Sequence, residues 1–338
     1  MTQRNKNTKP SFGILGAGSW GSALGILLAR NNHKVLIWDI NTQLLSSINK
    51  NRENNTYLPG IKFPENLQPA ESAKQVIYEC DILLLVIPSS AFRETLIEFK
   101  DLINRKKYIC WATKGLDSSS GGLLHQTVAD ILGKNIIPAI ISGPNFAKEV
   151  ASGLPTAVTV ASPDISFADA VADSLRSSVF RPYTSQDIVG VEVGGSIKNV
   201  LAVAAGISDG LGYGANARAG LITRGLNEMT RLGVAFGGKI ETFMGLSGVG
   251  DLVLTCTDNQ SRNRRFGIGL GQGKTLEKIQ NEIGQAIEGL RTAKEVYSLS
   301  KNLNIELPIC EQVYKVIYEN KPAKEAVNDL LNRPPKAE

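Results

Sequence analysis

Three glycines near the amino terminus have the spacing of a turn that binds phosphate groups. They stand in residues 16–21, between an apolar stretch and the start of a helical pattern. Gly16 would allow a tight turn, Gly18 would leave room for a pyrophosphate, and Gly21 would let helix and strand pack closely. The start of the helix would add amide donors and a positive dipole. The pattern predicts a dinucleotide-binding turn, and a merely structural glycine turn is the alternative.

One carboxylate, Asp39, follows the second apolar stretch of the chain. In a dinucleotide-binding unit, an acid about 20 residues beyond the turn commonly binds the ribose 2′-hydroxyl of NAD and repels the 2′-phosphate of NADP. The alternative is a solvated Asp that ends a strand, because turns favour this residue for their own reasons. The sequence leaves the choice between NAD and NADP open.

Two lysines are the candidates for proton transfer. Lys198 interrupts an apolar helical segment just after two glycines, and Lys114 directly follows a strand pattern. The two histidines, His33 and His125, lie where structural roles are common. A lysine desolvated beside other cations can have its pKa lowered toward neutrality, as general acid–base catalysis needs. The alternatives are that Lys198 reaches along its helix to solvent and that Lys114 is an ordinary loop lysine.

Further polar groups stand in the second half of the chain. Asp251 follows a glycine-rich stretch, and residues 261–265 combine guanidinium groups with an amide. The fork of an arginine side chain suits a phosphate group. For Arg264 and Arg265, however, we expect a charged helix start that faces water.

The composition excludes several classes of protein. Of 338 residues, 42% are hydrophobic and 33 are glycine, which is enough apolar material for two cores. The net charge of +5 suits small anions, but the basic residues are dispersed without interleaved aromatics, so we expect no nucleic-acid partner. Widely spaced cysteines without a C-x-x-C motif predict buried thiols, no disulfide and no metal site. These cysteines are Cys80, Cys110, Cys256 and Cys310.

The amino-terminal residues 1–10 are polar and contain no apolar core of a signal peptide. No later stretch approaches the roughly 18 uninterrupted apolar residues that cross a bilayer. We therefore expect a cytoplasmic protein without stable membrane insertion.

Alternating strand and helix patterns would position the candidate residues in the first half. The strand patterns cover residues 12–15, 35–38, 82–87, 108–112, 136–141 and 156–160, with helical patterns between them. This alternation predicts an α/β fold, a Rossmann-type doubly wound sheet that is mostly parallel. Ligands gather beyond the carboxyl ends of such strands. We expect the loops at Gly16, Pro88, Lys114 and Ser142 to share one crevice.

The second half has a different character. Apolar residues recur near helical spacing over residues 188–207, and residues 221–232 and 276–287 are also helical in pattern. We therefore expect an NAD(P)-binding Rossmann domain over residues 1–188 and an all-α, substrate-binding C-terminal domain over residues 189–338, with a short tail from residue 333. The cleft between the domains would hold the substrate.

Eight segments, in this order and spacing, resemble the bacterial NAD(P)-dependent glycerol-3-phosphate dehydrogenase family. They are GAGSWG, VIPS, WATKGL, ISGPNFAKE, GGSIKNVLA, DGLGYGANARAGLITRGL, GVGDLVLTCT and NQSRNRRFG. The resemblance runs from about Phe12 to about Leu331. It implies reduction of dihydroxyacetone phosphate to sn-glycerol 3-phosphate for phospholipid synthesis, by a cytoplasmic homodimer that uses NAD or NADP.

The resemblance also implies roles for particular residues. Lys198 would donate the proton to the developing alkoxide and act as the base in the reverse direction. The substrate contacts would be Lys114, Gly143, Asn145, Lys198, Asp251, Ser261, Arg262 and Asn263. Beyond the three glycines and Asp39, the cofactor contacts would be Ser19, Trp20, Lys114, Ala147, Arg262, Ala286 and Glu288.

Two positions depart from the family pattern. The family often has threonine where this chain has Asn145, and a polar contact should survive that change. The position of Asp39 is not generally acidic in the family, which puts a preference for NADP in doubt.

Two other functions remain open at this point. One is another small-acid dehydrogenase in which helices follow a Rossmann domain, such as a 3-hydroxyacid or ketopantoate type. The other is a redox-sensing module that binds NADH without chemistry and passes the signal to a partner. The second would need an exposed partner surface or a recognition domain, and the sequence shows neither.

Overall fold

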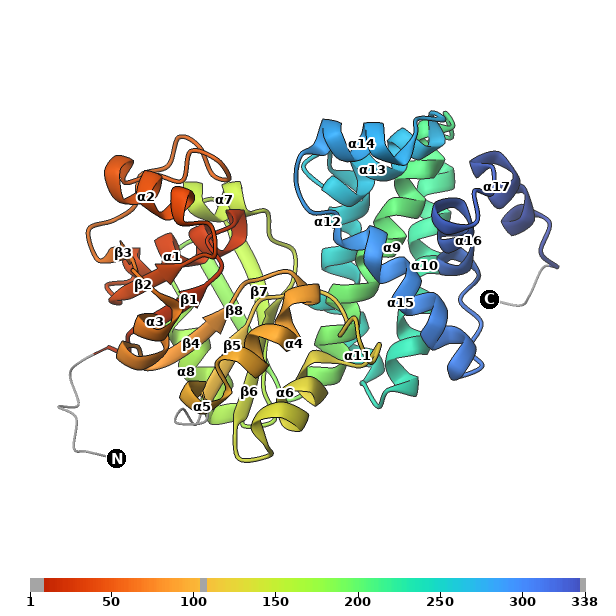
Figure 1. Ribbon diagram of the computed structural model, residues 1–338. Helices are drawn as coiled ribbons and strands as arrows, with labels where there is room; N and C mark the ends of the chain where they lie inside the picture. The colour runs from red at the N-terminus through yellow and green to blue at the C-terminus, as the bar shows by residue number, and fades with distance from the viewer. Residues whose placement is uncertain (1–8, 104–107, 335–338) are drawn as a thin grey trace. The chain divides into compact units, whose positions relative to one another are not determined.

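The computed structural model describes residues 9–103 and 108–334. The chain divides into two compact units, each with its own core (Figure 1). The first unit comprises Met1–Thr113 and Leu124–Ile188, and the second comprises Lys114–Leu123 and Val189–Glu338. The segment Lys114–Leu123 thus groups with the second unit, although it lies within residues 1–188.

The first unit is built on a sheet with the strand order β3-β2-β1-β4-β5-β6-β7-β8. Neighbours from β3 to β6 are parallel, β7 is antiparallel to β6, and β8 is parallel to β7. The order reverses between β1 and β4, which confirms the expected Rossmann-type, mostly parallel sheet. The strands are β1 (Phe12–Leu15), β2 (Val35–Trp38), β3 (Leu67–Pro69), β4 (Ile82–Leu85), β5 (Tyr108–Trp111), β6 (Ile137–Ser142), β7 (Thr156–Ala161) and β8 (Phe180–Ser185).

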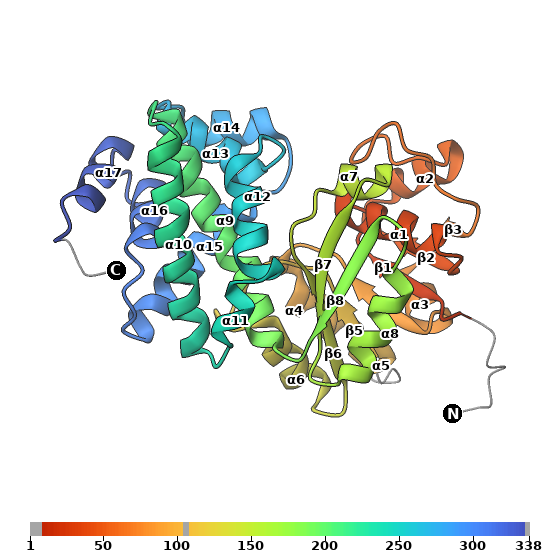
Figure 2. The ribbon, with the colours of Figure 1, turned by 180° about the vertical axis from the view of Figure 1, so that it is seen from behind.

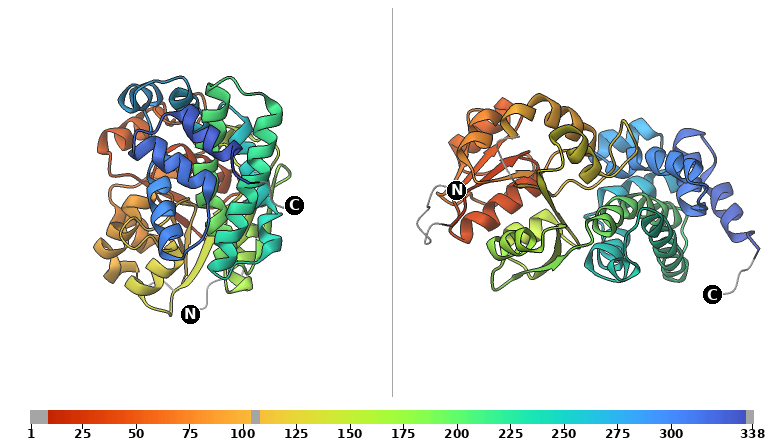
Figure 3. Two further views of the ribbon diagram at one scale, coloured as in Figure 1. Left: turned by 90° about the vertical axis from the view of Figure 1, so that its right-hand side faces the viewer. Right: turned by 90° about the horizontal axis from the view of Figure 1, so that it is seen from below.

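Helices cover both faces of this sheet because its central strands are apolar on both sides. All four residues of β1 and all four of β4 are buried. One layer contains α1 (Ser19–Arg30), α7 (Ala147–Ser152) and α8 (Ile165–Leu175), and α8 lies beside β7 and β8 (Figure 2). The other layer contains α3 (Ala73–Glu79), α4 (Ser89–Glu98), α5 (Lys100–Ile103) and α6 (Leu124–Leu132), while α2 (Thr42–Asn51) packs beside β3. The view from below in Figure 3 shows helices on either side of the sheet.

Within the residues described, the secondary structure of the second unit consists of helices without strands, as its sequence pattern predicts. Its long helices α9 and α10 are drawn in green in Figure 1. The helices are α9 (Ile188–Gly210), α10 (Ala215–Ala235), α11 (Ile240–Phe243), the π-helix η1 (Leu246–Gly250), α12 (Asp251–Thr257), α13 (Arg262–Gly271), α14 (Leu276–Ile283), α15 (Glu288–Asn302), α16 (Pro308–Tyr318) and α17 (Ala323–Leu331).

Helix α9 is the core helix of the second unit. It is long and apolar enough to cross a membrane, but 94% of its most apolar window is buried inside the protein. Its buried residues also include the polar Glu192, Lys198 and Asn199. A buried polar side chain is costly unless it is hydrogen-bonded or paired, so these residues indicate where the helix serves more than packing.

Glycines bring α9 and α13 into close backbone contact. A Cβ atom on Gly206 would lie 2.1 Å from the carbonyl oxygen of Arg264, and one on Gly267 would lie 2.1 Å from that of Val203. No side chain fits at these distances. The crossing therefore fixes the helix that carries Lys198 against the helix that begins at Arg262.

Candidate functional site

The dinucleotide turn lies between β1 and α1 in the first unit. Gly16 has φ +108°, a conformation that only glycine adopts readily. A Cβ atom on Gly21 would lie 1.9 Å from the carbonyl oxygen of Gly16, whereas one on Gly18 would meet no heavy atom within 4 Å. The turn is therefore tight on one side and open at Gly18, where a pyrophosphate would need space.

The side chain of Asp39 is bound to this turn. Its Oδ2 accepts a hydrogen bond from the backbone N–H of Ala17 at 2.8 Å, and its Oδ1 accepts one from that of Asn41 at 3.0 Å. The carboxylate at the end of β2 thus lies against the middle of the glycine turn. Each carboxylate oxygen keeps a lone pair for a further donor.

A second feature beside the turn, an unpaired hydrogen-bond donor among the described residues, also fits a dinucleotide. Trp20, in the first turn of α1, has its Nε1 atom buried without a hydrogen-bond partner in the described part of the chain.

The other predicted residues of the first unit follow β6. Gly143 has φ +133°, the Asn145 side chain donates to the carbonyl oxygen of Gly143 at 2.6 Å, and Ala147 begins α7.

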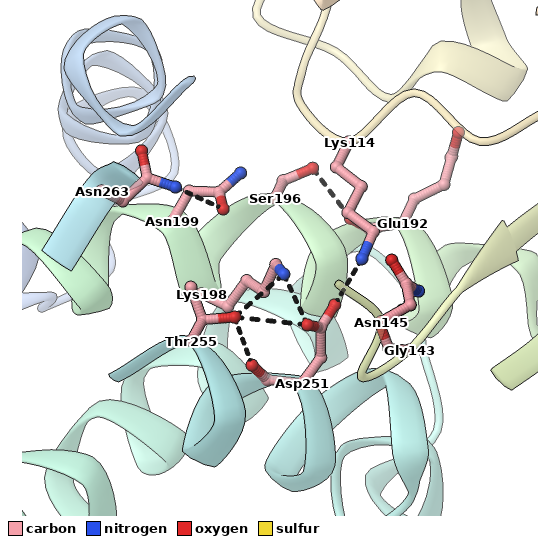
Figure 4. A network of polar contacts seen from close by, with 10 residues as sticks. All are labelled: Lys114, Gly143, Asn145, Glu192, Ser196, Lys198, Asn199, Asp251, Thr255 and Asn263. Atoms are coloured by element: carbon pink, nitrogen blue, oxygen red, sulfur yellow. Dashed lines mark hydrogen bonds and ion pairs between the residues drawn. The ribbon is translucent and has the colours of Figure 1, made fainter. Parts of the chain in front are cut away.

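A lysine–aspartate–lysine cluster lies inside the second unit (Figure 4). Asp251, the first residue of α12, accepts from Lys198 Nζ at 2.5 Å and from Lys114 Nζ at 2.8 Å. Only 1% of Asp251 and 6% of Lys198 is exposed. The structure therefore brings together three of the predicted residues, one each from α9, α12 and the segment 114–123. Lys198 does not reach along its helix to bulk water, and Lys114 is not an ordinary exposed lysine.

Thr255 completes this cluster and was not predicted. Its hydroxyl lies 3.0 Å from Lys198 Nζ and donates to the carbonyl oxygen of Asp251 at 2.6 Å. Residues four apart on a helix share a face, so the spacing of Asp251 and Thr255 in the sequence was a usable signal.

Burial and charge act in opposite directions on the cluster. The pKa of Lys198 is lowered to about 8, chiefly by desolvation, with the charge of Asp251 acting to raise it and the charge of Lys114 acting to lower it. Burial acts to raise the pKa of Asp251, but the two lysines hold it below its ordinary value. The cluster therefore contains a firmly ionised carboxylate beside an ammonium group that can release its proton near neutral pH.

A second polar group surrounds the start of α13. Ser261 caps this helix by accepting from the backbone N–H of Arg264, and the Asn263 amide donates to Asn199 Oδ1 at 2.9 Å. Asn263 Oδ1 in turn accepts from the backbone N–H of Gly289 at 2.9 Å. Asn263 thus joins α9, α13 and α15 (Figure 4 shows its bond to Asn199).

Arg262, the first residue of α13, is largely shielded from solvent. Desolvation lowers the pKa of its guanidinium, while the charge of Glu288 acts to raise it. Its Nη1 lies 3.2 Å from Gln285 Oε1. Two predicted cofactor contacts lie close by in the sequence. Ala286 is the residue after Gln285, and Glu288 is the first residue of α15.

The expectation for Arg264 is wrong. Its side chain is buried and forms an ion pair with Asp209, with Nε and Nη2 at 3.0 and 2.6 Å from Oδ2. Arg265 is exposed, as expected. Neighbouring helical residues point about 100° apart, so one arginine of the pair faces the core where the other faces water.

Neither a metal centre nor a disulfide is found among residues 9–103 and 108–334. No group of three or more His, Cys, Asp or Glu side chains there could hold a metal ion. The four cysteines are buried thiols. His33 is buried with its Nδ1 2.8 Å from the carbonyl oxygen of Pro10, and burial lowers its pKa.

Two family models match consecutive parts of the chain. The model described as NAD-dependent glycerol-3-phosphate dehydrogenase N-terminus matches residues 11–168, and the corresponding C-terminus model matches residues 187–328. The chain belongs to the NAD-dependent glycerol-3-phosphate dehydrogenase family.

Several members of this family are similar to the chain over nearly its whole length. The glycerol-3-phosphate dehydrogenase [NAD(P)+] of Colwellia psychrerythraea is 51% identical over 96% of this chain and 98% of its own. That of Vibrio parahaemolyticus is 48% identical over 100% and 99%. The crystal structure of glycerol-3-phosphate dehydrogenase from Coxiella burnetii has a TM-score of 0.93 at 48% identity, covering 96% of this chain and 99% of that one.

More distant structures share only the fold. A ketopantoate reductase from Ralstonia eutropha has a TM-score of 0.59 at 14% identity, covering 94% of this chain and 99% of that one. This is the architecture of one alternative function raised by the sequence. At such identity it carries no argument about the substrate.

Proposed function

We propose that the cluster of Lys198, Asp251 and Lys114 is the proton-transfer centre of this NAD(P)-dependent glycerol-3-phosphate dehydrogenase, which interconverts dihydroxyacetone phosphate and sn-glycerol 3-phosphate. The observation that carries the assignment is a buried ammonium group with a pKa of about 8, held 2.5 Å from a buried carboxylate. A group that titrates near the working pH is suited to both proton donation and proton removal.

The chemistry divides between the cofactor and the side chains. When bound, a reduced nicotinamide supplies the hydride for the carbonyl carbon of the substrate. Lys198 would deliver a proton from Nζ to the oxygen of that carbonyl, which completes the alcohol. Asp251 would hold the ammonium group in position, and the charge of Lys114 would stabilise negative charge on the oxygen. In the reverse direction, neutral Lys198 would take the proton back.

The other predicted residues would bind the two ligands. Arg262 has the fork for the substrate phosphate, aided by Ser261 and Asn263, and Gly143 and Asn145 would contact the substrate from the first unit. The glycine turn, Ser19, Trp20 and Asp39 would bind the dinucleotide, together with Ala147, Ala286 and Glu288. Lys114 and Arg262 would touch both ligands. The carboxylate of Asp39 would repel a 2′-phosphate, which favours NAD.

We further propose that the functional domains divide near residue 188, as the sequence predicts, and that two chains form a cytoplasmic homodimer. The product would then supply glycerophospholipid synthesis. The family resemblance supports these assignments, and the basic character of the chain suits an anionic substrate.

Replacement of Lys198 tests the proton-transfer assignment. In Lys198→Ala, we expect turnover of dihydroxyacetone phosphate with NADH to fall by roughly 10² or more, the scale of lost general acid catalysis. The dissociation constant of NADH should stay within about twofold of the parent value, because the turn lies in the other unit.

The matched control is Lys324→Ala, which removes an exposed lysine from α17 and should leave both quantities unchanged. Unchanged turnover in folded Lys198→Ala would refute the proposed role. Faster NADH oxidation with a phosphate-free keto acid than with dihydroxyacetone phosphate would instead contradict the assignment of dihydroxyacetone phosphate as the substrate.

A further inference from the structure

A completely buried asparagine lies next to the dinucleotide turn, outside the predicted site. Asn54 stands in the segment that follows α2, and its exposed fraction is 0%. Its Nδ2 donates to the carbonyl oxygen of Ala17 at 2.7 Å and to Ser22 Oγ at 2.8 Å. Its Oδ1 accepts from the backbone N–H of Tyr57 at 3.0 Å. Three of the four hydrogen bonds that an amide side chain can make are thus used.

A second side chain joins the same two segments. The hydroxyl of Ser19, the first residue of α1, donates to the carbonyl oxygen of Tyr57 at 2.8 Å. The segment 54–57 is therefore bound to the turn and the start of α1 through the side-chain amide of Asn54 and the carbonyl oxygen of Tyr57. We call the pair Asn54 and Ser19 the turn latch.

Asn54 of the turn latch provides one of the hydrogen bonds that hold the backbone of Ala17. The carbonyl oxygen of Ala17 binds Asn54, while its N–H binds Asp39 at 2.8 Å. Ala17 lies between Gly16 and Gly18, which are free to adopt other conformations in an unsupported chain. Side chains from two later segments therefore hold the orientation of the peptide groups that precede α1.

The chain just before the segment 54–57 is also fixed. Arg52 Nη2 donates to the carbonyl oxygens of Pro64 and Leu67 at 2.6 and 2.7 Å, which ties the segment to the start of β3. Asn54 also accepts at its own carbonyl oxygen from the N–H of Leu58 at 2.8 Å. The support is thus anchored to the sheet and is not a loose loop.

This arrangement limits what Ser19 can offer an anion. A phosphate oxygen only accepts hydrogen bonds, and a serine hydroxyl has a single hydrogen to donate. In Ser19 that hydrogen is directed at Tyr57. The side chain of Ser19 therefore supports the turn, and any contribution to a phosphate comes from its backbone N–H at the helix start.

We infer that Asn54 is a positioning residue for the dinucleotide, which acts by holding the turn in its binding conformation with the help of Ser19. The inference rests on the proposed function, because it presumes that the turn binds the dinucleotide. A turn already held in the bound shape loses less conformational entropy when the ligand arrives. The effect therefore falls on cofactor affinity and not on proton transfer.

The test is Asn54→Asp, which keeps the size and the acceptor toward Tyr57 but removes both donors. We expect the KM and the dissociation constant of NADH to rise about tenfold or more, with kcat at saturating NADH and the KM of dihydroxyacetone phosphate within about twofold of the parent. The matched control is Asn51→Asp, because Asn51 is exposed at the end of α2 and its side-chain amide donates to Ser47 Oγ at 3.2 Å, away from the turn.

A second pair of variants serves if Asn54→Asp does not fold. Ser19→Ala removes the other half of the turn latch and should weaken NADH about threefold to tenfold, whereas Ser19→Thr keeps the hydroxyl and should restore affinity. A general loss of structure would not produce this rescue or a selective change in the KM of NADH.

The outcomes separate this inference from the proposed function. If the latch variants fold and bind NADH as the parent does, the inference is wrong while the dehydrogenase assignment stands. If they lose kcat with no change in NADH affinity, the inference is also wrong. If the parent itself neither binds NADH nor reduces dihydroxyacetone phosphate, the proposed function fails and the inference fails with it.

Discussion

At the scale of single residues, the unusual feature is a lysine buried in the core of a helical unit. Burying an ammonium group is costly unless it is paired and hydrogen-bonded. Lys198 has both kinds of partner, Asp251 and Thr255, and its pKa is nevertheless lowered to about 8 by desolvation. The fold keeps this proton available at the expense of stability, which is common at functional sites.

The pKa of Lys198 predicts opposite pH dependences for the two directions of the reaction. Reduction needs the protonated amine, so kcat/KM for dihydroxyacetone phosphate should be level below pH about 8 and fall about tenfold per pH unit above it. Oxidation of glycerol 3-phosphate needs the neutral amine and should rise up to the same pH and then level off. Initial rates from pH 6 to 10 at saturating cofactor measure both curves.

Asp251 provides the internal check on this assignment. Its charge raises the pKa of Lys198. In Asp251→Asn, the limb of each pH–rate curve, which is the part where the rate changes with pH, should therefore move to lower pH. The control Asp169→Asn, at an exposed position of α8, should leave the limb in place. A limb that stays near pH 8 in Asp251→Asn would mean that another group titrates.

At the scale of elements, the close crossing of α9 and α13 sets the positions of Lys198 and Arg262. Sequence periodicity found α9 because its apolar positions recur along one segment. It did not reveal that Gly206 and Gly267 make backbone contact with the opposite helix, since a glycine in a helical pattern looks the same whether it faces a neighbour or water.

A single methyl group should disrupt that crossing. In Gly267→Ala, the new Cβ would meet the backbone of Val203 at 2.1 Å, so the helices must separate. We expect a loss of about 1–3 kcal/mol in the free energy of unfolding, measured by urea titration. In the control Gly220→Ala, on α10 with open space around the new Cβ, stability should rise by about 0.5–1 kcal/mol. Equal stability of Gly267→Ala and the parent would contradict the close contact.

The least predictable elements are those whose place is decided by their neighbours. β3 has only three residues, and β8 alternates buried with exposed positions and includes Pro182, so neither has the continuous apolar pattern of β1 or β4. Their pairing depends on the edge that the rest of the sheet presents.

At the scale of the whole molecule, the two units can be observed separately. The chain has three tryptophans, Trp20, Trp38 and Trp111, and all belong to the first unit. Tryptophan fluorescence therefore reports the unfolding of the unit that carries the glycine turn, while far-ultraviolet circular dichroism also reports the helical unit.

Cofactor binding should stabilise the unit reported by tryptophan. NAD+ at about 100 times its dissociation constant should add roughly 2.7 kcal/mol to the free energy of unfolding of the state that binds it. In a domain of this size that corresponds to a rise of about 5–10 °C in the midpoint of thermal unfolding. Sodium phosphate at equal concentration is the control. An unshifted fluorescence transition with saturating NAD+ would place the cofactor outside the first unit.

The sequence alone determined what is encoded locally. The glycine turn, the apolar strands of the Rossmann-type sheet, the change to helices near residue 188 and the anomaly of Lys198 in an apolar helix all follow from neighbouring residues and their period. The family resemblance added the substrate and the candidate contacts.

Only the tertiary structure decided which of those residues meet. Asp251 reaches Lys198 across 53 positions and Lys114 across 137, while Asn54 reaches Ala17 across 37. Arg264 is buried against Asp209, although its sequence reads as a charged helix start. The reason is physical: a local pattern states which face of an element is apolar, but the partner of a polar side chain is chosen by how distant elements pack.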